Sequence, residues 1–206
     1  MNRLVPLLLL AAAVLAFATV FLVILPAGEI RTVAPPPQLE PYTEAELRGR
    51  AQYVSLGCVY CHSQQPRAPE QGPDADRGWG RASTAPDYAY DSPHLLGTMR
   101  TGPDLLNIGA RIPSQAWHLT HLYQPRAIHP TSIMPNYPFL FETRAEAGPE
   151  DVVVKLPDAL LPDNGVVVAT QEALDLVSYL LSLDRTYPVS NPDLRDNGYA
   201  DRGKTQ

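Results

Sequence analysis

The sequence predicts a mainly α protein: one N-terminal transmembrane helix, then a helical domain with long loops and room for a small β-hairpin. Three observations predict this fold class. A charge-free apolar run spans Leu4 to Leu25, two later segments carry helical hydrophobic spacing, and the stretches between them are rich in Pro and Gly. After the N-terminal segments about 160 of the 206 residues remain, which is enough for one domain.

The apolar run is long enough to cross a membrane as a helix. A hydrocarbon core of about 30 Å needs about 20 apolar residues. The alternative is a cleaved signal peptide, because Ala16-Phe17-Ala18 offers a cleavage site. The run exceeds the usual apolar region of about 7–15 residues, and cleavage would leave apolar residues 21–25 exposed. The sequence therefore favours an uncleaved anchor over residues 1–28, held in the lipid bilayer by one helix.

Behind the anchor we expect a spacer, one domain and a tail. Residues 29–41 contain Ala34-Pro35-Pro36-Pro37, which is typical of a short, stiff polyproline spacer. Residues 42–186 are assigned to the domain, and residues 187–206, which are polar and rich in Gly and Asp, to a mobile tail. The net charge of −6 argues against nucleic acid as a partner and leaves no basic stripe for anionic lipid.

Helix signals appear at three places in the domain. Thr43-x-x-Glu46 is a capping box, and the helix it starts carries Leu47, Ala51 and Val54 at helical spacing before Gly57 ends it. Residues 114–123 predict a short helix that Pro125 stops. Residues 171–183 predict an amphipathic helix with one apolar face. That face consists of Leu174, Val177 and Leu181.

Two segments have weaker signals. Residues 63–93 are rich in Pro, Gly, Asp and Arg without periodicity, which predicts a long loop that is ordered by itself or by a partner. Residues 151–156 and 165–169 each contain three consecutive valines, so they offer a small β-hairpin.

The motif with the clearest chemistry is C-x-x-C-H, formed by Cys58, Cys61 and His62. It is the signature of one covalently attached haem c: the two thiols form thioethers to the haem vinyl groups, and the histidine is the proximal iron ligand. The rival interpretations are a zinc half-site, a redox pair and a disulfide. Zinc would need a second pair, for which His118 and His121 are poorly spaced, and a redox pair would not need His62.

A second axial ligand has several candidates. Met1 lies at the wrong end of the anchor, Met99 is next to the charged Arg100, and Met134 lies in a loop stiffened by prolines. The alternatives are four histidines that could equally be surface or hydrogen-bonded residues. These are His94, His118, His121 and His129.

Three further residues are candidates for the haem environment. The carbonyl of Pro103, in the Gly102-Pro103 pair, could accept a hydrogen bond from the imidazole of His62, unless the pair is a simple turn. Trp117 could line the haem pocket or belong to the ordinary core. Arg126 could pair with a haem propionate or with a surface carboxylate.

Four sequence blocks together resemble the membrane-anchored mono-haem subunit (subunit II) of cbb3-type cytochrome c oxidases. The blocks cover residues 57–64, 100–105, 117–126 and 132–140, in the same order as in that family. The resemblance implies a class I cytochrome c fold with His62 and Met134 as iron ligands. It ends near Phe141; the valine-rich residues 151–169 and the Pro/Gly-rich residues 66–86 depart from the pattern.

The resemblance also implies partners and a location. The chain would lie between a di-haem cytochrome c subunit and the catalytic haem–copper subunit of the oxidase. Because c-type haem is attached on the outer side of the bacterial inner membrane, we expect a single-pass protein with its cytochrome domain in the periplasm.

The function expected from these features is electron relay, with no active site of the chain's own. One alternative is the cytochrome c subunit of a nitric-oxide reductase, although the blocks at 117–122 and 137–140 favour the oxidase. An alternative of another class is a haem-based sensor or binding module, which would need an iron with a vacant or labile position.

Overall fold

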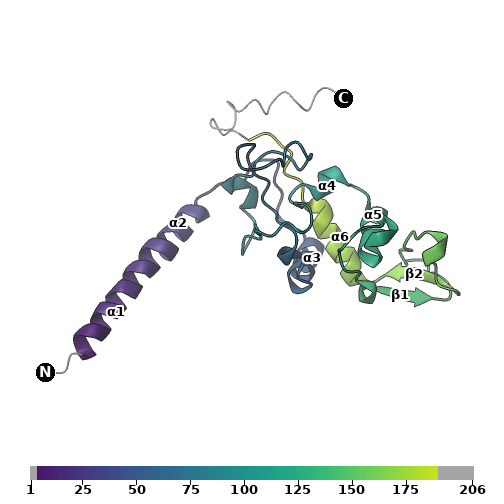
Figure 1. The fold of residues 1–206 in the computed structure, drawn as a ribbon, viewed down its shortest axis with the longest axis horizontal. Coiled ribbons are helices and arrows are strands. Elements are labelled where there is room, and N and C mark those ends of the chain that lie inside the picture. The colour runs from purple at the N-terminus through teal and green to yellow at the C-terminus, as the bar shows by residue number, and fades with distance from the viewer. Residues whose placement is uncertain (1–3, 190–206) are drawn as a thin grey trace. The chain divides into compact units, whose positions relative to one another are not determined.

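The computed structural model describes residues 4–189, so most of the predicted tail at 187–206 lies outside the described residues. The chain is mainly helical, with one small sheet (Figure 1). It forms two compact units. Among the described residues, one contains 4–39 together with 84–91, and the other contains 40–83 together with 92–189.

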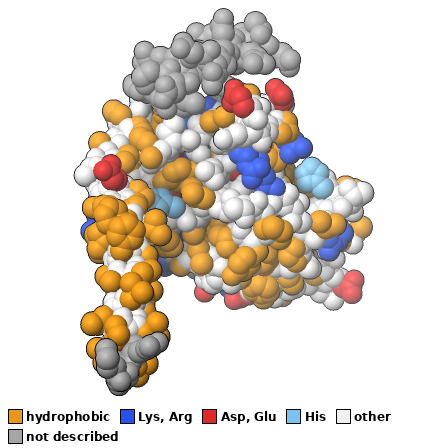
Figure 2. Space-filling model, turned by 60° about the vertical axis from the view of Figure 1, so that its left-hand side comes forward, with side chains coloured by type: hydrophobic (Ala, Val, Ile, Leu, Met, Phe, Trp, Pro, Cys, Tyr) orange, Lys and Arg blue, Asp and Glu red, His pale blue; other side chains and the backbone are white. Residues whose placement is uncertain are grey.

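The first unit contains the predicted membrane helix. Helix α1 (Leu4–Thr19), a π-helical turn (Val20–Ile24) and α2 (Leu25–Arg31) follow one another without a break. Together they form a helix of 28 residues that is long and apolar enough to cross a membrane. Hydrophobic side chains coat it along its length (Figure 2). The helix continues to Arg31, into the stretch predicted to be spacer.

The predicted loop at 63–93 is divided between the two units. Residues 84–91 belong with the spacer in the first unit, and the rest belongs to the domain. Within residues 84–91, a short turn of 3-10 helix (Ala85–Tyr88) begins at Thr84, whose amide donates to Asp87 Oδ2 at 2.7 Å. The loop therefore contains local structure that its composition does not predict.

The domain is built on two helices, α3 (Glu44–Ser55) and α6 (Gln171–Ser182), which pack against each other (Figure 1). The predicted capping box of α3 is present, with the Thr43 amide 2.6 Å from Glu46 Oε2. Gly57 ends the helix segment in the left-handed region, at φ 75°. This conformation suits glycine and turns the chain directly into the C-x-x-C-H motif.

The contact between α3 and α6 depends on a face of α3 that the sequence pattern does not indicate. A Cβ at Gly49 would lie 1.9 Å from the carbonyl oxygen of Asp175, so the two backbones can approach only at a glycine. Next to it, the rings of Tyr53 and Tyr179 meet edge to face with centroids 5.5 Å apart. The expected apolar positions of α3 are exposed instead. These are Leu47, Ala51 and Val54.

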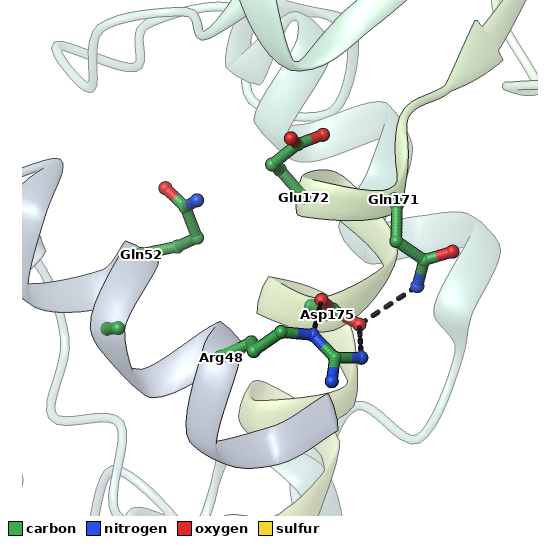
Figure 3. A pocket seen from close by; sticks show the side chains of 6 residues that line it. Arg48, Gln52, Gln171, Glu172 and Asp175 are labelled. Atoms are coloured by element: carbon green, nitrogen blue, oxygen red, sulfur yellow. Dashed lines mark hydrogen bonds and ion pairs between the residues drawn. The ribbon is translucent and has the colours of Figure 1, made fainter. Parts of the chain in front are cut away.

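An ion pair flanks this crossing (Figure 3). Arg48 Nε lies 2.6 Å from Asp175 Oδ2, and Gln171 Nε2 donates to Asp175 Oδ1 at 2.9 Å. These residues line a shallow surface pocket together with Gln52 and Glu172. Both oxygens of the Asp175 carboxylate have hydrogen-bond donors, and the bonds from Arg48 join α3 to α6.

The remaining elements complete the core. Helices α4 (Ile108–Arg111) and α5 (Gln115–Tyr123) pack against α6. Ser114 caps α5, and its last residue, Tyr123, agrees with the predicted end before Pro125. The buried core gathers side chains from all four of these helices and from the sheet. Its fully buried members include Tyr53, Leu119, Val167, Leu176, Val177, Tyr179 and Leu183.

The small sheet differs from the predicted hairpin. Strands β1 (Phe141–Arg144) and β2 (Val166–Ala169) pair antiparallel, with Phe141 opposite Ala169. The predicted partner, residues 151–156, joins the other edge of β2 only through the single bridge Val153–Val168. β1 was missed because only its first residue is buried, so its sequence has no apolar alternation.

Candidate haem site

The C-x-x-C-H motif forms a tight turn directly after α3. Cys58–Tyr60 is one turn of 3-10 helix, and the amides of Cys61 and His62 both donate to the Cys58 carbonyl, at 3.1 and 2.9 Å. Both thiols are free and half-buried. Burial raises the pKa of Cys58 to about 11, so this thiol is neutral at pH 7 before any bond to haem forms.

The structure places the Pro103 carbonyl oxygen 2.8 Å from Nδ1 of His62. A carbonyl can only accept, so Nδ1 carries the proton and Nε2 keeps its lone pair. Burial lowers the pKa of His62, which also favours the neutral imidazole. This is the tautomer that a metal ion requires at Nε2, and the hydrogen bond fixes the orientation of the ring.

Gly102 makes this approach possible. Its amide donates to the Cys61 carbonyl at 2.9 Å, which holds the backbone at Gly102 against the imidazole of His62. A Cβ at this position would lie 2.2 Å from Cε1 of His62, so a side chain cannot fit without moving the ring. The Gly102-Pro103 pair therefore passes close to the imidazole, as the predicted hydrogen bond from His62 requires.

A buried carboxylate, which sequence reasoning missed, lies behind this segment. Asp104 is 0% exposed and accepts hydrogen bonds from Ser63 Oγ, the Gln65 amide and the Leu106 amide, at 2.6, 2.7 and 3.0 Å. Burial raises the pKa of Asp104. These bonds tie the residues after His62 to the residues after Pro103. The sequence does carry one signal for this burial: Asp104 is a charged residue placed between Pro103 and two leucines.

Arg100 extends the network into the long loop. Its Nη1 lies 2.6 Å from Oδ1 of the fully buried Asp74, and its Nη2 lies 3.6 Å from Asp104 Oδ2. The guanidinium also lies over the ring of Trp79, 5.5 Å from its centroid. The part of the loop before residue 84 is therefore ordered by the same residues that hold the segment under His62.

The candidate second ligands fall into clearly different surroundings. Met134 is half-buried and packs against the core, whereas Met99 is 57% exposed. His118 is buried and its Nε2 bonds to the Ile112 carbonyl at 2.9 Å, so it is a hydrogen-bonded core histidine. His94 and His129 are exposed.

The loop that carries Met134 returns to the cysteines. The Tyr137 amide donates to the Leu122 carbonyl at 2.9 Å, which fixes the loop to α5. Burial raises the pKa of Tyr137, and the Cys58 and Cys61 thiols lie close enough to add to the shift. Tyr137, three positions after Met134, therefore lies near the C-x-x-C-H turn.

Arg126 contacts the Met134 loop. Its Nη1 donates to the carbonyls of Ser132 and Met134, at 2.9 and 3.2 Å. Within the described residues, no carboxylate lies within ion-pairing distance of Arg126. Of the two expected partners, a propionate and a surface carboxylate, the second is therefore not found among residues 4–189.

Trp117 and His121, one turn apart on α5, stack with ring centroids 4.7 Å apart. Trp117 is half-buried and does not belong to the core cluster. Burial lowers the pKa of His121 to about 4, and the nearby His129, His118 and His62 add to this shift. Among the described residues, Nδ1 of His121 and Nε of Arg111 are buried without a hydrogen-bond partner.

These residues fit a haem. A c-type haem with histidine and methionine ligands needs two thiols, an imidazole and a thioether. The site offers the thiols of Cys58 and Cys61, the free Nε2 of His62 and the half-buried thioether of Met134. Nδ1 of His121 and Nε of Arg111 are buried without a hydrogen-bond partner, and both side chains interact electrostatically with His62. Buried polar atoms normally have a partner, and a polar group of a bound ligand could supply one here.

The helix pair α3–α6, with the C-x-x-C-H turn after α3 and a methionine loop further on, defines a class I cytochrome c with an N-terminal membrane-spanning helix as a candidate anchor. The family described as cytochrome c oxidase, mono-heme subunit/FixO matches residues 2–158. The chain therefore belongs to this family of oxidase subunits, which confirms the resemblance seen in the sequence. The match extends past Phe141, where the recognised blocks end. No curated protein matches the sequence.

Proposed function

We propose that the chain relays electrons to the catalytic haem–copper subunit of a cbb3-type oxidase, through one haem c bound by Cys58 and Cys61. A haem bound there would supply a one-electron couple. The observation that carries the proposal is the His62–Pro103 hydrogen bond of 2.8 Å within a family of mono-haem oxidase subunits. It leaves His62 ready to bind iron through Nε2.

The residues around the site have distinct roles in this proposal. Cys58 and Cys61 would hold the haem through thioethers, and His62 and Met134 would bind its iron. With two protein ligands on the iron, dioxygen would have no place to bind, so the chain has no active site of its own. His/Met ligation gives a higher reduction potential than two histidines would, which suits a carrier close to the oxygen end of a respiratory chain.

The location and the partners follow from the same proposal. The helix 4–31 anchors the chain in the bacterial inner membrane, the domain lies in the periplasm, and the second electron-transfer partner is a di-haem cytochrome c subunit. Trp117 lines the haem pocket in this proposal, since it stacks on His121 outside the core.

The test is the native complex, purified in detergent through a tag on this chain. We expect the haem–copper subunit to co-purify, and the reduced haem c to be reoxidised within one turnover when oxygen is added. The isolated chain, as the control, should be reoxidised far more slowly and should not bind carbon monoxide. Reoxidation in the complex by nitric oxide but not by oxygen would favour the nitric-oxide reductase alternative. Carbon monoxide binding by the isolated chain would favour the sensor.

The anchor has its own test. Because no residue of the helix 4–31 is buried and residues 4–28 carry no charge, we expect it to remain uncleaved in the mature protein. Mass spectrometry of the mature chain should find residues 4–25. A mature N-terminus beyond Ala18 would show that the segment is a signal peptide.

A further inference from the structure

In the loop that carries Met134, the methionine packs against the core but its neighbours do not. Ile133 is 79% exposed, and Pro135 and Asn136 are exposed as well. The loop is closed by local bonds: the Ser132 amide donates to the His129 carbonyl at 2.8 Å, and the Met134 amide donates to Ser132 Oγ at 3.2 Å. Such bonds shape the turn but do not attach it to the domain.

Arg126 makes that attachment on the side where the loop begins. It lies in the 3-10 turn Pro125–Ala127 directly after α5, and Pro125 is buried. Its guanidinium is planar and holds two carbonyls at once, those of Ser132 and Met134. The second carbonyl belongs to the residue whose sulfur is the proposed ligand.

We propose that Arg126 is a positioning residue for the Met134 sulfur, which ties the ligand loop to the end of α5 and keeps it closed. This inference rests on the proposed His62/Met134 ligation. It gives Arg126 a role other than pairing with a haem propionate. Charge-assisted hydrogen bonds are stronger than neutral ones, so removing them raises the fraction of molecules in which the loop is open.

The test is competition between Met134 and added imidazole in the purified, oxidised full chain in detergent. Imidazole binds only when the loop opens, so its apparent affinity rises with the open fraction. The loss of the near-infrared sulfur-to-iron band reports the exchange. For Arg126→Gln we expect imidazole to bind about tenfold more tightly, which corresponds to the loss of one or two exposed charge-assisted bonds. Arg126→Lys should recover part of this difference.

The matched control is Arg144→Gln. Arg144 is also exposed and also uses Nη1 for two bonds, but these go to the Asp151 carboxylate next to β1. The substitution Arg144→Gln should leave the affinity for imidazole unchanged. If Arg126→Gln does not mature with haem, Arg126→Lys supports the same measurement, with an expected change of about threefold.

The outcomes separate this inference from the proposed ligation. If the near-infrared band survives in Met134→Ala, the ligation is wrong. If that band is lost in Met134→Ala but imidazole binds Arg126→Gln and the unmodified chain equally well, the positioning role alone is wrong. A lower reduction potential with unchanged imidazole affinity would indicate instead that Arg126 interacts with a propionate, and would also overturn the inference.

Discussion

The side of the site around His62 is held by fully buried polar groups, whereas the polar side chain that holds the side around Met134 is exposed. Behind His62, Ser63 and Asp104 are both 0% exposed and bond to each other at 2.6 Å. Around Met134, the loop is fastened by the Tyr137 amide and by the exposed side chain of Arg126, and the neighbouring Ile133 is 79% exposed.

The physical consequence is a difference in how easily each ligand is lost. A broken buried hydrogen bond leaves a polar group without water, so the whole network resists opening. An exposed bond competes with water at every moment and contributes less. We therefore expect His62 to stay fixed in all states of the folded chain, and Met134 to be the ligand that exchanges first.

The largest expected effect comes from Gly102→Ala, on the buried side. The added Cβ would lie 2.2 Å from Cε1 of His62, so either the imidazole or the segment 102–104 must move and the Pro103 bond is lost. We expect a destabilisation of about 3 kcal/mol or more and little mature haem protein. Haem-stained gels and urea unfolding measure both.

The control for this substitution is Gly72→Ala in the long loop. There the nearest atom, Asp74 Oδ1, would be 3.5 Å from the added Cβ, an ordinary contact. We expect a change within about 0.5 kcal/mol. Normal haem content and normal stability in Gly102→Ala would show that the backbone does not press on His62.

Met134→Ala tests the exposed side and should change coordination without loss of the haem. The covalent bonds depend on Cys58 and Cys61, so haem content should stay the same. The near-infrared sulfur-to-iron band of the oxidised protein should disappear, and carbon monoxide should bind the reduced protein. Met99→Ala is the control, because Met99 is 57% exposed; its spectrum should not change. The reverse pattern would show that Met99 is the ligand.

Much of the fold could be predicted because its signals are local. The capping box at Thr43, the stop at Pro125 and the left-handed Gly57 each depend on a few neighbouring residues. The buried face of α3 could not be predicted, because Gly49 has no hydrophobic side chain to signal it. Its burial follows from the approach of α6, more than a hundred positions further along the chain.

The site shows the same division. Cys58, Cys61 and His62 form one local motif, and the acceptor role of Pro103 follows from the chemistry of imidazole. The bonds of Arg126 to the Met134 loop could not be predicted, because an arginine offers several donors and the sequence does not say which carbonyls they meet. Asp104 was missed since a charged residue is normally assigned to the surface.

Asp104→Asn sharpens the comparison with the smallest expected effect. The amide has nearly the shape of the carboxylate but only one acceptor atom, so the Gln65 amide and Ser63 Oγ face an NH2 group in place of Oδ2. We expect a loss of about 2 kcal/mol in the free energy of unfolding, with the near-infrared band retained. Asp158→Asn, at an exposed position, should change stability by less than about 0.5 kcal/mol.

A double substitution tests whether Ser63 and Asp104 act together. In a Ser63→Ala background the cost of Asp104→Asn should fall, because the Ser63 hydroxyl no longer faces the new NH2 group. Equal costs in both backgrounds would mean that Ser63 and Asp104 do not act as one network, and the buried side would then be no more cooperative than the exposed one.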